Sequence, residues 1–81
     1  MKKNILIDFI ELMETDFSNE KKVSFLIYLK NGKKYEWSCK TNEIKNIIYK
    51  DEYILHKGIK INNNRKLSCL IKIDEISSIT F

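Results

Sequence analysis

Two apolar segments on either side of Asn31 and Gly32 can pair favourably in only one register, and this register determines much of the fold. A two-residue Asn-Gly turn would place polar side chains opposite the apolar ones of the first segment. A type I turn with Gly32 in the left-handed conformation, followed by a G1 bulge, instead aligns the apolar residues of both segments. Its pairs are Leu29 with Lys33, Ile27 with Tyr35, Phe25 with Trp37, and Val23 with Cys39. A slip of one residue would expose several of these side chains at roughly 1.5–3 kcal/mol each, so we predict the second register.

The two strands of this hairpin differ on their other face. The first strand carries Leu26 and Tyr28 there and is apolar on both sides, whereas the second carries Lys34 and Glu36. Charged residues on one face are typical of a solvated strand at the edge of a sheet. We therefore predict that the first strand is central and that the second lies near an edge.

The segment 4–12 fits two structures. Ile5 and Ile7 alternate as in a strand, whereas Leu6 and Ile10 recur at helical spacing. Because the segment is rich in isoleucine, we predict a strand that completes a three-stranded antiparallel meander with the hairpin. A helix is the alternative.

A short helix is predicted over residues 41–50. Thr41 is a suitable N-cap, and three isoleucines share one face of the helix. These isoleucines would cover the hairpin face that carries Leu26 and Tyr28. They are Ile44, Ile47 and Ile48.

The remaining sequence predicts short strands separated by turns. We expect a strand over 52–56, a break at Gly58, a hairpin of 59–61 with 67–73, a tight turn at 74–76 and a closing strand over 78–81. Ile79 and Phe81 should point inward from the closing strand.

Together these elements predict an α+β, β-rich fold: an antiparallel meander with one short helix, then a hairpin and a closing strand. A small, partly closed barrel is compatible with the same elements. The 81 residues leave room for one domain, 1–81. No apolar run approaches the roughly 18 residues of a membrane span, and no secretory leader is evident, so we expect a soluble, cytoplasmic protein without membrane contact.

The composition is biased in a way that complicates any argument from charge. Isoleucine, lysine and asparagine supply 14, 14 and 8 residues, while alanine, glutamine and proline are absent. AT-rich codons produce such a bias, which indicates a low-GC bacterium, or a phage or plasmid that lives in one. The net charge of +4 can therefore reflect the genome as well as a nucleic-acid partner.

The sequence shows no catalytic, metal or cofactor signature. His56 is the only histidine, and Gly32 and Gly58 are the only glycines, so no glycine-rich phosphate loop is present. Cys39 and Cys69 fall in predicted strands and are expected to be buried, reduced thiols, with a disulfide possible if those strands are neighbours. We expect neither enzymatic activity nor a bound cofactor.

Two hypotheses for function follow. The first is a non-enzymatic protein-binding module, encoded by a phage or plasmid, that inhibits or regulates a host protein; strand addition would use the edge over residues 34–40. The second is a nucleic-acid-binding domain in which the lysine-rich tips of the two hairpins contact phosphates. A homo-oligomer is a third arrangement. The candidate binding residues are Lys33, Lys34, Tyr35, Glu36, Arg65 and Lys66.

Overall fold

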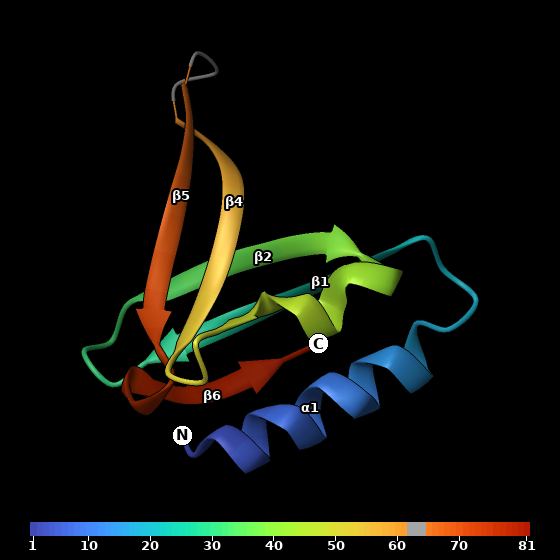
Figure 1. Cartoon of the computed structure of the whole chain (residues 1–81), viewed down its shortest axis with the longest axis horizontal. Helices are drawn as coiled ribbons and strands as arrows, with labels where there is room; N and C mark the ends of the chain where they lie inside the picture. The colour runs from blue at the N-terminus through green and yellow to red at the C-terminus, as the bar shows by residue number, and fades with distance from the viewer. Residues whose placement is uncertain (62–64) are drawn as a thin grey trace.

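The computed structural model describes residues 1–61 and 65–81, and the side chains of residues 1–55 and 68–81. These residues form one α-helix, two short 3₁₀ helices and two three-stranded antiparallel sheets, ordered β2-β1-β6 and β3-β4-β5 (Figure 1). The predicted α+β class is therefore confirmed. The elements along the chain are α1 (Lys3–Asp16), β1 (Lys22–Leu29), β2 (Lys34–Lys40), η1 (Thr41–Ile47), β3 (Ile48–Tyr49), β4 (Tyr53–Ile61), β5 (Arg65–Lys72), η2 (Ile73–Glu75) and β6 (Ile76–Thr80).

The β1–β2 hairpin adopts the predicted register. Its cross-strand pairs include Phe25 with Trp37. The Leu29 N–H donates to the Lys33 carbonyl at 2.8 Å, and Gly32 adopts a φ of +88°. β1 is the central strand of its sheet and β2 lies at one edge, as predicted.

The segment 4–12 is part of helix α1, so the predicted strand is wrong. A strand that buries Ile5 and Ile7 would leave Leu6 and Ile10 in solvent, on the face that carries Asp8. The helix buries Leu6 and Ile10 completely or nearly so and leaves Asp8 in solvent. The predicted meander is consequently absent, and β6 is the second neighbour of β1, with Ile27 opposite Ile79.

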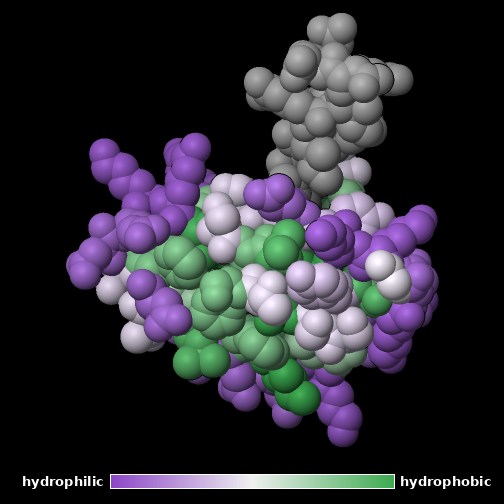
Figure 2. Space-filling model, turned by 180° about the vertical axis from the view of Figure 1, so that it is seen from behind, coloured by the Kyte–Doolittle hydropathy of each residue, from purple (hydrophilic) through white to green (hydrophobic). Residues whose placement is uncertain are grey.

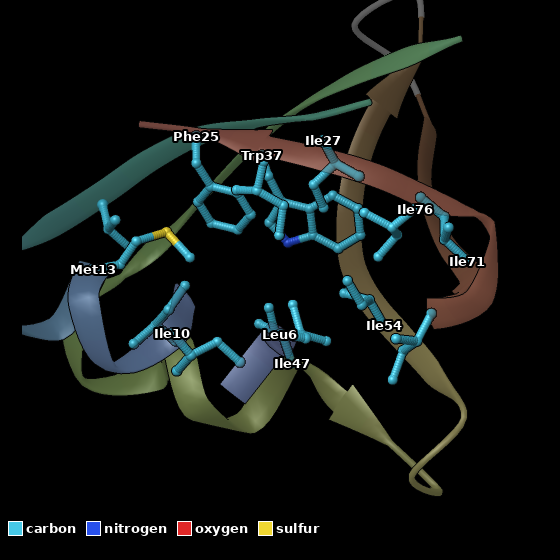
Figure 3. Packing of buried hydrophobic residues seen from close by; sticks show 14 residues of the cluster. Leu6, Ile10, Met13, Phe25, Ile27, Trp37, Ile47, Ile54, Ile71 and Ile76 are labelled. Atoms are coloured by element: carbon cyan, nitrogen blue, oxygen red, sulfur yellow. The ribbon is translucent and has the colours of Figure 1, made fainter. Parts of the chain in front are cut away.

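Helices α1 and η1 cover the same face of the β2-β1-β6 sheet, and the hydrophobic core lies between these helices and the sheet (Figure 3). From the sheet, Phe25 and Trp37 point into this core and stack with their ring centroids 6.2 Å apart. From α1, Leu6 and Ile10 point back toward them. The second sheet contributes side chains such as Ile54, which is fully buried.

Two predictions for the segment 41–50 are wrong, one on the helix itself and one on the face that it covers. It forms the shorter 3₁₀ helix η1, in which Thr41 is the first residue and no side chain caps the end. Ile44 and Ile47 are buried as expected, but in the core described above and not against Leu26 and Tyr28. Those two side chains lie on the outer face of the sheet and stay half-exposed. Beside α1, these two isoleucines belong to the same core as Phe25 and Trp37.

The second sheet contains one long strand where two were predicted. β4 runs from Tyr53 to Ile61, and Gly58 lies at a shift in register between His56 and Ile59 rather than at a break in the strand. The β4–β5 hairpin rises from the body of the molecule (Figure 1). The side chains in its distal part, residues 56–67, lie outside those that the structure describes. In the described part of the chain the two sheets stay separate, and no closed barrel forms.

The C-terminal residues pack partly as predicted. The expected tight turn is η2, and Ile79 of β6 is buried. Phe81 is 45% exposed, so its predicted inward position is wrong. Its ring lies edge-on to Phe9 at a centroid distance of 6.3 Å and tilted against Phe17 at 6.5 Å, both on or next to α1.

The two cysteines are free thiols in different sheets, each half-buried. Burial, with a contribution from the Glu43 carboxylate, raises the pKa of the Cys39 thiol above its usual value. The thiol therefore stays protonated to higher pH than an exposed one. In the described residues, no helix is long and apolar enough to cross a membrane.

Candidate binding surfaces

The predicted site residues at the first hairpin do not form one surface. Lys34 and Glu36 are exposed on the outer face of the sheet. Tyr35 points to the opposite face and is half-buried against the core. Lys33 lies at the turn, where its N–H donates to the Asn31 Oδ1 atom at 3.0 Å. Tyr35 is therefore poorly placed for a stacking role beside the exposed lysines.

The remaining predicted site residues belong to the second hairpin. Arg65 and Lys66 begin strand β5, with Lys66 opposite Lys60 in the backbone register. Their side chains lie outside the described residues, so their part in a binding site stays a prediction. The β4–β5 hairpin extends upward in Figure 1, whereas the β1–β2 turn lies at the left edge of the molecule.

The outer edge of β2 carries backbone groups that its one strand neighbour does not bind. In an antiparallel pair, hydrogen-bonded positions alternate with positions whose N–H and C=O groups point away. Leu29 bonds to Lys33 at one end of the β1–β2 ladder. At the other end the Thr41 N–H donates to the Lys21 carbonyl at 3.0 Å, so the odd-numbered residues face β1. The even-numbered residues of β2 direct their N–H and C=O groups to the free edge. They are Lys34, Glu36, Ser38 and Lys40.

The second surface is an apolar patch on α1, which we call the helix patch. It contains Ile5, Phe9 and Leu12, spaced so that they follow one side of the helix, together with Phe17 and Phe81. Ile5, Leu12 and Phe81 are 44%, 53% and 45% exposed. Figure 2 shows hydrophobic atoms along the lower side of the molecule, where α1 lies.

Carboxylates flank the helix patch. Asp8 and Asp16 lie one turn before and one turn after Leu12, and both are exposed. Glu11 adds a third exposed carboxylate next to them, and Lys3 is the only basic residue of the helix. The patch is therefore apolar with an acidic border, on a chain whose net charge is +4.

The described residues contain no group of three or more histidine, cysteine, aspartate or glutamate side chains that could hold a metal ion. The His56 side chain lies outside the described residues. Sequence reasoning missed the helix patch because the segment was predicted as a strand. The sequence did carry a signal for the patch, because apolar residues recur at helical spacing over 4–12. Ile5, Phe9 and Leu12 form a second apolar line on the helix, next to the residues that are buried. Compared with known proteins, the chain matches no family model, no curated protein and no solved structure.

Proposed function

We propose that the protein is a non-enzymatic binding module that docks a partner protein on the helix patch. The observation that carries this proposal is the exposure of Ile5, Leu12 and Phe81 on one side of the molecule. Exposed apolar side chains that gather in a patch, with a polar border, are typical of protein interaction sites. Docking a partner would remove this surface from water and so stabilise the complex.

The acidic border indicates the chemistry of the partner. A segment with apolar side chains at helical spacing and flanking lysines or arginines would bury its apolar side on Leu12 and place its cations near Asp8 and Asp16. We therefore propose a basic amphipathic helix of another protein as the occupant. By covering that helix, the module would inhibit or regulate the protein to which the helix belongs.

Two leucines of nearly equal exposure allow a matched test. Leu12 lies in the helix patch at 53% exposure, and Leu70 lies on β5 at 51%. The probe is a synthetic amphipathic peptide of leucine and lysine, compared with a peptide in which glutamate replaces lysine. We expect the basic peptide to bind more tightly, and Leu12→Ser to weaken its binding about tenfold while Leu70→Ser has little effect. Equal effects of the two substitutions, or no preference for the basic peptide, would overturn the proposal.

The natural partner can be sought with the same variants. The tagged chain would be used to capture proteins from a low-GC bacterial lysate, with one half of the lysate treated with nuclease. A stoichiometric protein that survives nuclease, and is lost with Leu12→Ser but kept with Leu70→Ser, is the expected result. Retention of nucleic acid, with the captured proteins lost on digestion, would favour the nucleic-acid alternative.

The edge of β2 offers a different route to the same function. Glu36→Pro removes an N–H that points to the free edge and leaves the ladder with β1 intact. Loss of partner binding in Glu36→Pro, with stability retained and Leu12→Ser still binding, would move the docking site from the helix patch to this edge.

A further inference from the structure

A lysine-lined hollow lies at the end of the β1–β2 hairpin opposite its turn. This end of the hairpin is at the right-hand side of Figure 1. The hollow is bordered by the end of α1, the connection to β1, and the junction of β2 with η1. Its volume is about 780 Å³. Four lysines and two glutamates contribute to its lining: Lys21, Lys22, Lys40, Lys45, Glu14 and Glu20.

Strand pairing holds two of the four lysines, Lys22 and Lys40, side by side. Lys22 and Lys40 are direct cross-strand partners, in a pair whose hydrogen-bonding groups point away from each other. Side chains approach most closely in such pairs, about 4.5–5.5 Å between Cβ atoms. The neighbouring residue Thr41 donates its N–H to the Lys21 carbonyl at 3.0 Å and its hydroxyl to the Glu20 carbonyl at 2.7 Å. These bonds and the strand pairing fix the part of the rim that carries Lys21, Lys22 and Lys40.

The charge of the hollow is only partly balanced. Two carboxylates accompany four ammonium groups, and among the described residues none of the four lysines forms an ion pair. Like charges directly opposite each other in a sheet repel and reduce stability. An anion bound between Lys22 and Lys40 would remove this repulsion and gain the attraction of both ammonium groups.

We infer that this hollow binds a ligand with adjacent phosphate groups. Lysine ammonium groups act as point charges toward phosphate, and two neighbouring ones can contact two neighbouring phosphates. The volume lies in the range of small-molecule sites. The phosphates can belong to a free oligophosphate, such as that of a nucleoside triphosphate, or to a nucleic-acid backbone. The inference uses none of the residues of the helix patch and does not depend on the proposed function.

The test exploits opposite effects of one substitution. Lys40→Gln removes the repulsion with Lys22, so the free protein should become more stable, while its affinity for phosphate should fall by about tenfold or more. Lys72→Gln makes the same change of charge on β5, at an exposed lysine outside the hollow. Tripolyphosphate is the probe, and thermal stability and calorimetric affinity are measured at constant ionic strength.

We expect tripolyphosphate to raise the melting temperature of the wild type and of Lys72→Gln, and to raise that of Lys40→Gln much less. No rise in the wild type, or the same loss in both variants, would overturn the inference, because a uniform loss reports net charge and not a site. A short single-stranded oligonucleotide distinguishes the two sources of phosphate. Binding that is displaced by tripolyphosphate and weakened by Lys40→Gln assigns the site to a nucleic-acid backbone, whereas binding of tripolyphosphate alone assigns it to a free oligophosphate.

Discussion

Replacing Leu6 and Leu12 separately by alanine tests both the helical structure of the N-terminal segment and the way it packs. Both residues lie in α1, and the same substitution changes helix propensity equally at the two positions. Leu6 is fully buried, whereas Leu12 is 53% exposed. In a helix the two side chains point to different sides, but in a strand two residues six positions apart would share a face.

The expected magnitudes follow from burial. Leu6→Ala removes three buried carbon atoms at about 0.8 kcal/mol each and leaves a cavity, so the free energy of unfolding should fall by about 3–5 kcal/mol. That is a large part of the roughly 4–12 kcal/mol expected for a domain of this size. Leu12→Ala removes atoms that are half in solvent and leaves no enclosed cavity, so its loss should be about 1 kcal/mol or less.

Urea denaturation followed by far-ultraviolet circular dichroism measures both variants against the wild type. A loss at least 2 kcal/mol larger for Leu6→Ala than for Leu12→Ala is the expected outcome, as a rough threshold from the same burial argument. Equal losses would refute the helix and its packing, since they are what a strand with both leucines on one face would give.

Four further predictions concern two turns and a thiol. Gly32→Ala should lower the free energy of unfolding by about 1 kcal/mol, because the φ of +88° is strained for alanine while no atom lies within 4 Å of the added Cβ; a loss above about 3 kcal/mol would indicate a collision instead. Lys50→Gly should raise it by less than about 1 kcal/mol in urea denaturation, because relief of the φ of 50° is partly offset by loss of the contact between the Lys50 Nζ atom and the Tyr49 ring at 5.4 Å; a loss above about 1 kcal/mol would contradict that backbone conformation. The Cys39 thiol should react with iodoacetamide more slowly at pH 8 in the folded than in the urea-unfolded protein, as measured by mass spectrometry, since its pKa is raised by burial and by Glu43. For the same reason stability should fall as the pH rises above about 9.0, where the unfolded thiol loses its proton first, and a Cys39→Ser variant that shows the same fall would refute this assignment.

The hairpin could be predicted because local and longer-range signals agree. The left-handed position of Gly32 and the alternation of apolar residues require the same register, and the charges of Lys34 and Glu36 identify the edge strand. In the segment 4–12 the apolar residues recur both with a period of two and with a period near 3.6, so their positions alone could not distinguish a strand from a helix. The available signal for a helix was that a strand would expose Leu6 and Ile10 beside Asp8, whereas a helix buries both leucine and isoleucine and leaves Asp8 in solvent.

The candidate binding surfaces depend on contacts that no short segment contains. The helix patch exists only once the segment is helical and Phe81 lies against Phe9, 72 positions earlier in the chain. The lysine hollow joins Lys21 and Lys22 to Lys40 and Lys45 through the pairing of β1 with β2. The predicted hairpin register already placed Lys22 near Lys40, but the position of η1 and of the end of α1 could not be deduced from the pattern of the sequence.

The sheet order β2-β1-β6 has a consequence for how the chain reaches its folded state. β1 and β2 are joined by a short turn, and hairpins of this kind form in about 1–10 μs. β6 pairs with the other side of β1, with Leu26 opposite Thr80, so this pairing must close a long loop and lose much more chain entropy. Until β6 arrives, one side of β1 carries unpaired backbone groups next to Leu26 and Tyr28. During that interval a second unfolded chain can compete for the same edge, and the rate of β6 docking then decides between correct folding and aggregation.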